Sequence, residues 1–449
     1  MEHESHELAL HESEQMRIRK RKLEELMANG IAPFGEKFVC SHNTQEIKEK
    51  FLDLENKEVT IAGRIISLRR QGKLTFGNIM DFYGQIQILA KIDILGENLY
   101  DEFSKLDIGD IIGIKGEVFK TNRGEITVKI TEYRYLAKSL RPLPEKWHGL
   151  KDTDIRYRQR YLDLIVNPEV KHTFVLRTKI IKSMKKFLDE RGFIEVDTPV
   201  LSNIAGGGHA RPFLTHHNAL DLDLTLRIAL ELYHKRLIVG GFERIYEIGK
   251  CFRNEGISTR HNPEFTLMEL YQAYADYEDM MKLVEEMFSS VAYEVLGTMK
   301  VTYQGTELDL TPPWPRLSML EAIKRYAGID WTEIKSDEQA VALARSKGLK
   351  VNEKMTRGMI LDEICAEFVE PNLIQPTFLV DYPVDISPLA KKRADNPELT
   401  YRFEVFIYGR ETANAFSELN DPIEQRERFL QQAREKAKGN EEAMVWDED

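Results

Sequence analysis

Cysteine is scarce in this sequence, and long apolar runs are missing. Only Cys40, Cys251 and Cys365 occur among the 449 residues, at long spacings. No CxxC pair or histidine group completes a zinc site, so a disulfide framework and structural zinc are both disfavoured. No apolar stretch approaches the roughly 18 to 20 residues that cross a bilayer, and the N-terminus lacks the basic and apolar regions of a secretion signal. We therefore expect a cytoplasmic protein without membrane contact.

An excess of positive charge is also missing. Lys and Arg number 63 against 74 Asp and Glu, which gives a formal net charge of -11. Indiscriminate nucleic-acid binding depends on neutralising many phosphates, so any RNA contact must use local patches and the reading of individual bases. One basic patch, 17–22, lies in a helix predicted over 5–29. It forms either a solvated amphipathic arm or a contact to an RNA backbone.

Neither internal repeats nor low-complexity tracts occur, and the length with 42% hydrophobic content predicts a multidomain globular chain. Between 57 and 136 the sequence changes to short β-rich runs, with one helix, 99–106, after the third run. The predicted strands are 59–67, 75–81, 86–90, 111–118 and 126–130. This order is typical of an OB-fold, a small barrel whose second and third strands commonly bind oligonucleotides.

The chain divides into four predicted parts. These are an N-terminal helical arm (1–56), the five-stranded OB-fold barrel (57–140), a hinge (141–165) and a large domain (166–449). Pro142 and Pro144 mark the hinge. In the large domain helix-like and strand-like segments alternate, which predicts an antiparallel sheet flanked by helices and an α+β fold overall.

The most informative stretch is 252–265, which predicts a strand, a polar loop and a returning strand. The loop is dense in ionisable groups: Arg253, Glu255, Arg260, His261 and Glu264. So many charges are costly to bury unless they hold a charged ligand. An arginine near the sheet suits a carboxylate or an α-phosphate, and a ring such as that of Phe265 suits stacking on a purine.

This stretch resembles motif 2 of the class II aminoacyl-tRNA synthetases. The segment 192–199 resembles motif 1, the helix and strand that build the dimer interface in that class. The similarity is closest to the lysine enzymes, in 206–213, 227–233 and 411–420, and it covers about 15–449. It implies a homodimer that activates lysine with ATP to lysyl-adenylate and then transfers the lysine to tRNA(Lys).

The resemblance also implies how ATP is held. On the matching positions, Arg253 holds the substrate carboxylate and the α-phosphate, and three further residues position ATP, namely Glu255, His261 and Phe265. Catalysis then depends on electrostatic relief of a pentavalent phosphate more than on a proton acceptor.

Glu404 and Glu411 match the acidic pair that holds Mg²⁺ on the ATP phosphates in this family. Carboxylates are suitable hard-oxygen ligands for that cation. The alternative for these two residues is a solvated strand edge.

Lysine brings two ammonium groups and one carboxylate, so a selective pocket needs several buried carboxylates. The resemblance implies a lysine site made of Gly207, Glu231, Glu269, Tyr271, Asn414, Phe416 and Glu418. A neutral or shorter substrate would leave the anionic groups around the far ammonium unpaired, which gives selectivity. Leu230 departs from the proline that the family predicts, and this change could shift the backbone that carries Glu231.

In the barrel, Phe76 and Gln87 match positions that read the anticodon, with Arg64 nearby and Glu125 as a weaker candidate. Stacking on an aromatic ring together with amide hydrogen bonds is a sound way to read unpaired bases. Without the resemblance, a lone phenylalanine in a strand would be assigned to the core.

One family feature is not found, the glycine-rich motif 3 whose arginine clamps ATP. If the sequence is the whole polypeptide, ATP loses a charge-assisted contact and the sheet loses a strand. The alternative function is therefore a catalytically inactive truncated fragment, or a tRNA-binding or regulatory product. An aspartyl or asparaginyl enzyme is disfavoured because its substrate side chain would meet Glu269 and Glu418. A paralogue that lysylates a protein is disfavoured because such enzymes resemble only the catalytic half.

Overall fold

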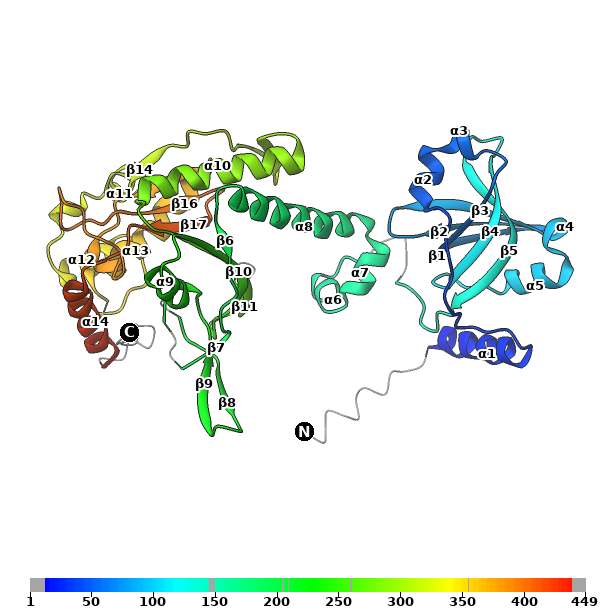
Figure 1. Cartoon of the computed structure of the whole chain (residues 1–449), viewed down its shortest axis with the longest axis horizontal. Helices are drawn as coiled ribbons and strands as arrows, with labels where there is room; N and C mark the ends of the chain where they lie inside the picture. Colours follow the sequence, from blue (N-terminus) through cyan, green and yellow to red (C-terminus); the bar gives the residue numbers. More distant parts are fainter. Residues whose placement is uncertain are drawn as a thin grey trace. The chain divides into compact units, whose positions relative to one another are not determined.

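A computed structural model describes residues 13–144, 150–203, 206–208, 210–258, 261–353 and 355–437, with side chains to 434. The chain forms two compact units, Met1–Thr173 and Phe174–Asp449 (Figure 1). Arg260 and the first residues of the predicted N-terminal helix lie outside the described residues. Among the helices that are described, none is both long and apolar enough to cross a membrane.

The first unit is built on a closed five-stranded barrel with the strand order β1-β2-β3-β5-β4. Its strands are β1 Glu58–Gln71, β2 Leu74–Met80, β3 Gln85–Lys91, β4 Ile111–Lys120 and β5 Ile126–Ala137. The predicted order of three strands, a helical insertion and two strands is confirmed. The insertion is two short helices, α4 Ile92–Leu95 and α5 Glu97–Ser104, because Gly96 adopts a φ of 76° between them.

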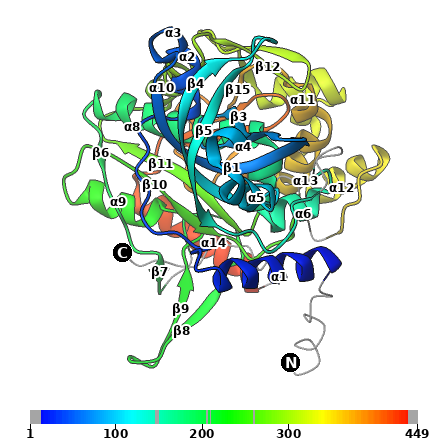
Figure 2. The same ribbon diagram turned by 90° about the vertical axis from the view of Figure 1, so that its right-hand side faces the viewer.

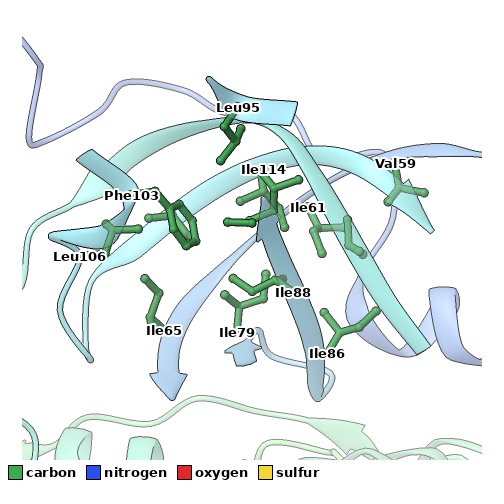
Figure 3. Close-up of a cluster of buried hydrophobic side chains, with 14 of the residues drawn as sticks. Val59, Ile61, Ile65, Ile79, Ile86, Ile88, Leu95, Phe103, Leu106 and Ile114 are labelled. Atoms are coloured by element: carbon green, nitrogen blue, oxygen red, sulfur yellow. The ribbon is translucent and has the colours of Figure 1, made fainter. Parts of the chain in front are cut away.

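The barrel interior is filled by the inward-facing residues of every strand. Ile61, Ile79, Ile88 and Ile114 are fully buried and meet at the centre (Figure 3). Phe103 from α5 closes the core. Full burial of each such side chain contributes about 1.5 to 3 kcal/mol relative to exposure. Alternation along the strands places the intervening residues on the outer face.

Three further helices of the first unit precede the barrel: α1 Glu14–Ala28, α2 Thr44–Glu49 and α3 Phe51–Leu54. Ser13 caps α1, and Asn43 with Glu46 forms a capping box at α2. Ile47 and Leu54 belong to the barrel core.

The basic patch of α1 is partly used for internal anchoring. Arg19 is 8% exposed, and its guanidinium donates to the carbonyl oxygens of Ile108, Ser139 and Arg141 at 2.9 to 3.2 Å. Lys22 pairs with Asp107 at 2.6 Å. Arg19 is therefore neither solvated nor available to a phosphate, which differs from both sequence interpretations of the patch.

Three helices follow the barrel: α6 Thr153–Arg158, α7 Arg160–Val166 and α8 Pro168–Asp189. The helical segment predicted at 156–164 is broken at Gln159, which is not helical. Asp163 holds the break together, because its carboxylate accepts hydrogen bonds from Arg156 at 2.9 Å and Asn167 at 2.7 Å, and from Arg160.

The second unit contains several sheets. One has the order β11-β10-β6, in which β10 Arg244–Phe252 pairs antiparallel with β11 Glu264–Gln272 and parallel with β6 Ile194–Glu195. A second has the order β14-β15-β16-β17. Its strands are β14 Arg316–Ser318, β15 Thr377–Val380, β16 Arg402–Phe406 and β17 Glu411–Phe416. The predicted antiparallel pairing is present in both, and each sheet also has one parallel edge strand.

Two smaller strand groups complete the unit. A three-stranded sheet has the order β7-β9-β8, with β7 Leu201–Ser202, β8 Leu214–His217 and β9 Leu222–Leu226. Figures 1 and 2 show β8 and β9 as a ribbon that extends away from the rest of the second unit. A hairpin is formed by β12 Lys300–Tyr303 and β13 Thr306–Asp309.

The helix α10 Tyr277–Leu296 connects the cores of the two larger sheets. Its N-terminal half contributes Tyr277 and Met281 to the cluster around Phe403 of β16. Its C-terminal half contributes Met287 to the cluster around Tyr246 of β10. One rigid helix with residues in both clusters fixes the distance between the sheets, which is a requirement for a site that draws residues from both.

The remaining helices pack around these sheets. They are α9 Glu231–Val239, α11 Met319–Ala327, α12 Asp337–Ser346, α13 Arg357–Ile364 and α14 Pro422–Ala437. The helices α11, α12 and α13 share a core with Leu379 of β15 and Phe406 of β16, and β16 is the strand that carries Glu404.

Candidate active site and base-reading face

Arg253 and Phe265 come together at the loop end of the β10–β11 hairpin. The backbone N–H of Arg253 donates to Pro263 O at 2.9 Å, directly after the last register pair, Phe252 with Glu264. The Arg253 guanidinium lies 5.2 Å from the Phe265 ring centroid. A guanidinium held over an aromatic face is pre-oriented for a planar anion.

Glu255 and His261 lie on the loop that joins β10 and β11, and both are exposed. His261 is tied to Ser258, whose hydroxyl lies 2.9 Å from His261 Nδ1 and accepts from the His261 N–H at 3.0 Å. The structure therefore places these two predicted ATP residues on the loop that begins at Arg253.

Glu404 and Glu411 lie on the neighbouring strands β16 and β17. Glu404 accepts hydrogen bonds from the Tyr382 hydroxyl at 2.8 Å and from Arg402 at 2.5 Å. Lost hydration, followed by the negative charge of Glu404, raises the pKa of Glu411 to about 7, while the charge of Arg402 and, to a smaller extent, that of Arg253 oppose this rise. Arg253 and Glu411 thus share one electrostatic environment although they are far apart in the sequence.

This carboxylate pair fits a magnesium ion that is shared with phosphates. Mutual repulsion between two carboxylates is relieved by a bound cation. The part of the chain that the structure describes contains no group of three or more His, Cys, Asp or Glu side chains arranged to hold a metal ion. Mg²⁺ commonly uses one or two carboxylates and completes its coordination with substrate phosphates and water.

The predicted lysine residues gather around the start of α9. Gly207 has a φ of 82°, and a Cβ at this position would lie 2.9 Å from the Cβ of Glu231, so only glycine allows this close approach. Glu269 accepts a hydrogen bond from the Tyr271 hydroxyl at 3.1 Å and from the Leu230 N–H at 2.9 Å. The elements α9 and β11 therefore bring the first carboxylates of the pocket together.

Glu418 and Phe416 join the same cluster through Lys235, a residue that the sequence interpretation missed. The Lys235 ammonium lies 2.5 Å from Glu231 Oε1, 2.9 Å from Glu418 Oε2 and 6.0 Å from the Phe416 ring centroid. The spacing of Glu231 and Lys235, four residues apart on one helix, is a sequence signal for an ion pair. It gives no indication of the second partner, because Glu418 comes from another part of the chain.

Two carboxylates of this cluster, those of Glu269 and Glu418, have raised pKa values. Burial, followed by the charge of Glu231, raises the pKa of Glu269 to about 8. Burial also raises the pKa of Glu418 to about 7, against the opposing charge of Lys235. Such shifts show anionic groups that lack sufficient positive charge, which is the condition that a cationic ligand relieves.

Asn414 lies two residues before Phe416 on β17, but its amide donates to Glu404 Oε1 at 3.3 Å and its oxygen accepts from Arg402 at 3.4 Å. Asn414 was predicted for the lysine site, but in the structure its side chain contacts Glu404, a residue of the Glu404–Glu411 pair. It connects that pair with the carboxylate cluster along one strand.

A buried polar network links α9 to β10 through His234 and Glu247. Glu247 accepts from Arg227 at 2.8 Å and from Thr198 at 2.6 Å, and lies 3.3 Å from His234 Nε2. Burial alone would raise the pKa of Glu247, but these hydrogen bonds and the charge of Arg227 hold it below its ordinary value. Gly249 leaves room for the network, because a Cβ there would lie 2.4 Å from the Arg227 guanidinium. Sequence reasoning missed this network, since its members contact one another only after folding.

On the barrel of the first unit, Phe76, Gln87 and Glu125 lie on consecutive strands or at their ends. Gln87 pairs in register with Asn78, two residues after Phe76. Thr127 donates to Gln87 Oε1 at 2.8 Å and to the carbonyl oxygen of Glu125 at 3.2 Å. The structure thus places these three predicted residues on adjacent parts of β2, β3 and the entry to β5.

Arg64 is not part of this group. It pairs in register with Met80 at the far end of β2, and its guanidinium donates to Gly109 O at 2.8 Å. It lines a cavity of about 320 Å³ together with Lys171. Arg69 of β1 is the residue that stands opposite Phe76, and it is exposed. The sequence analysis did not identify it, because only the register of the strands shows which residue faces Phe76.

Comparisons with known proteins identify the family to which the chain is similar. A family described as tRNA synthetases class II (D, K and N) matches residues 152–447, and an OB-fold nucleic acid binding domain matches residues 59–136. A protein of Moorella thermoacetica named lysine--tRNA ligase is 59% identical over 438 residues, which cover 98% of this chain and 90% of that protein. Proteins with the same name from Pelotomaculum thermopropionicum and Clostridium perfringens are 59% and 56% identical, over 97% and 99% of this chain and 87% and 90% of their own lengths.

Proposed function

The chain belongs to the class II tRNA synthetases and to their lysine--tRNA ligase branch, and from this premise we propose that it activates L-lysine with ATP and transfers it to tRNA(Lys). One observation carries the proposal. The segment 228–231 meets Arg253 through the carbonyl oxygen of Ile228 at 3.5 Å and Glu269 through the N–H of Leu230 at 2.9 Å. A single backbone segment therefore lies between a guanidinium for anions and a carboxylate cluster for ammonium groups.

In this proposal the amino acid is held by charge at both ends. The carboxylates of Glu231, Glu269 and Glu418 bind its ammonium groups, and the Arg253 fork binds its carboxylate beside the α-phosphate. The reaction then needs the carboxylate oxygen aligned with the α-phosphorus and the growing negative charge stabilised by Arg253. Amino acids with uncharged or shorter side chains leave these carboxylates unpaired, so the site rejects such amino acids.

ATP is placed by residues around the same arginine. The Phe265 ring stacks on the purine, and Glu255 and His261 approach from the loop. Glu404 and Glu411 would hold Mg²⁺, which neutralises phosphate charge when it is bound. The raised pKa of Glu411 supports its part in this pair.

The tRNA is recognised by the barrel. Phe76 offers a stacking surface and Gln87 offers an amide to an unpaired base, while Glu125 lies beside them at the entry to β5. Arg64 is proposed as a contact to the RNA near the cavity that it shares with Lys171. The proposal includes the predicted division of the chain into 1–56, 57–140, 141–165 and 166–449. It also includes a cytoplasmic location, where tRNA is charged.

A homodimer is proposed through the segment that resembles motif 1. Ile194, Val200 and Leu201 are exposed apolar side chains in and beside β6 and β7. Exposed apolar residues in sequence proximity favour a protein interface. Sedimentation velocity of the chain alone and of a variant with Ile194 and Leu201 changed to Ser would test this, with loss of the dimer expected for the variant.

The proposal is tested by amino-acid-dependent exchange of pyrophosphate into ATP. Lysine should support exchange, whereas aspartate and asparagine should not. Arg253→Lys keeps the charge but loses the fork, and a loss of about 100-fold or more is expected. Arg316→Lys is the matched control, because Arg316 also lies over a phenylalanine ring, at 5.5 Å from that of Phe378.

Two results would reject the proposal. Exchange that depends on aspartate would assign the pocket to another amino acid. Absence of exchange with any amino acid, combined with specific binding of tRNA(Lys), would instead identify a tRNA-binding protein without synthetase activity.

A further inference from the structure

The ammonium of Lys235 already occupies contacts that suit a ligand. It lies between Glu231 and Glu418, at 2.5 and 2.9 Å, and close to the ring of Phe416. Glu231 is the first residue of α9, and Glu418 follows β17, so this side chain joins two elements that are distant in sequence. None of the roles derived above for ATP, lysine or tRNA uses Lys235.

An ordinary helix ion pair does not account for this arrangement. Exposed pairs spaced by four residues on a helix contribute little to stability. Here the Glu231 side chain is 8% exposed and the Lys235 side chain 28% exposed. Burial by itself would lower the pKa of Lys235, but the charges of Glu231 and Glu418 raise it above its ordinary value, so the group stays an ammonium ion.

The charges of the cluster can be counted. The three carboxylates of Glu231, Glu269 and Glu418 carry three negative charges when ionised, and Lys235 supplies one positive charge, which leaves a net charge of two negative. Lysine brings two ammonium groups, and its carboxylate is matched separately by Arg253. With Lys235 present, the charges of the pocket and the ligand therefore balance.

We propose that Lys235 is a positioning and specificity-determining residue, a built-in cation that holds Glu231 and Glu418 together and sets the charge of the pocket to match the two ammonium groups of L-lysine. This inference rests on the proposed function, because it assumes that the cluster binds lysine. It assigns to Lys235 a permanent place in the occupied pocket, beside the ligand and not in competition with it.

Removal of the cation has a definite electrostatic consequence. The groups that face Lys235 and its partners are Glu231 on α9, Glu269 and Tyr271 on β11, and Glu418 after β17. Without the cation, the pKa values of Glu269 and Glu418 rise further, so more of these two carboxylates are protonated at neutral pH. Lysine must then displace additional protons, which weakens its binding and moves the pH dependence of binding upward.

The test compares L-lysine binding by titration calorimetry between pH 6 and 9 for the full chain and for Lys235→Gln, Lys235→Met and Lys235→Arg. The two neutral variants should weaken lysine binding about tenfold or more and move the midpoint of its pH dependence up by about one pH unit, since tenfold corresponds to one pKa unit. Lys235→Arg should bind within about threefold of the wild type, because it restores the charge. ATP binding should be unchanged throughout.

Lys324→Gln is the matched control, because Lys324 pairs with Asp330 at 2.7 Å on an exposed surface of the same unit. Unchanged lysine affinity and pH profile in the neutral variants would overturn the inference and reduce Lys235 to a helix ion pair. Tighter lysine binding would also overturn it, since Lys235 would then compete with the ligand. Absence of lysine binding by the wild type would instead reject the proposed function.

Discussion

The backbone N–H of Leu230 donates a 2.9 Å hydrogen bond to Oε2 of Glu269. The family resemblance predicts proline at this position, and proline has no N–H to donate. The bond favours the ionised carboxylate, and it therefore opposes the burial and the Glu231 charge that raise the pKa of Glu269 to about 8. The departure from proline thus has an electrostatic consequence in the pocket.

Lysine affinity should rise with pH. Glu269 and Glu418, with pKa values of about 8 and about 7, hold protons at slightly acidic pH, and an ammonium ligand requires the ionised forms. The dissociation constant should fall by up to about tenfold per pH unit for each of the two groups as the pH rises to its pKa, and it should level off about one unit above the pKa of Glu269. Calorimetry in buffers of different ionisation enthalpy should show proton release on binding at pH 7. Glu269→Gln should remove the portion of the pH dependence near pH 8, which comes from Glu269. A lysine affinity that does not change with pH in the wild type would contradict the assignment of these carboxylates to lysine binding.

Leu230→Pro should move the pH midpoint of lysine binding upward relative to Leu230→Ala. Both variants lose the buried leucine side chain, but only proline removes the N–H that stabilises ionised Glu269. A shift of about half a pH unit or more is expected, given that a hydrogen bond to a charged group contributes about 1.5 to 3 kcal/mol. Equal midpoints for the two variants would show that this bond has no influence on the pocket.

Glu418→Gln should raise the KM for lysine about 10-fold to 100-fold in pyrophosphate exchange, with little effect on the KM for ATP. The change removes a negative charge from the cluster and one partner of Lys235. Glu398→Gln, at an exposed position of the same unit, is the control and should behave as wild type. An equal loss of apparent affinity for lysine and ATP would mean that Glu418 supports the whole site and does not select the amino acid.

Phe76→Ala should lower kcat/KM for tRNA(Lys) in aminoacylation about 5-fold to 100-fold, because stacking of one base contributes about 1 to 3 kcal/mol. Lysine-dependent pyrophosphate exchange should be unchanged, since the barrel lies in the other unit. Phe119→Ala on β4 is a control at a similarly half-buried position of the same barrel. A matching loss in both variants would indicate damage to the barrel and not loss of a base contact.

Arg19→Ala should release the helix α1 from the barrel. The variant loses hydrogen bonds from a buried guanidinium to three carbonyl oxygens, while Arg21→Ala removes an exposed charge from the same patch. Hydrogen exchange followed by mass spectrometry should show at least tenfold faster exchange of the amides of 14–28 in the first variant only. Similar exchange in both variants would mean that other contacts hold the helix.

The barrel shows which features follow from local sequence. Buried residues alternate along 74–79 of β2 and 85–88 of β3, and this period of two is a backbone property that any extended strand imposes. The order of the strands and the helical insertion were predictable for that reason. The ends of the strands were less predictable. β1 and β5 extend beyond their apolar runs, and there only the pairing with neighbouring strands defines the strand.

The chemical groups of the candidate site were predictable as types, since motif 2 and the carboxylates near Tyr271 and Phe416 stand in continuous segments. By itself the sequence determined the family, the strand and helix types and the set of charged groups, because these depend on residues close along the chain. Only the tertiary structure decided that Lys235 bridges Glu231 and Glu418, that Leu230 bonds Glu269 and that Arg19 is buried. Apart from the pair of Lys235 with Glu231 on one helix, these contacts join distant segments, and such contacts are set by the packing and register of the whole fold, which no local pattern encodes.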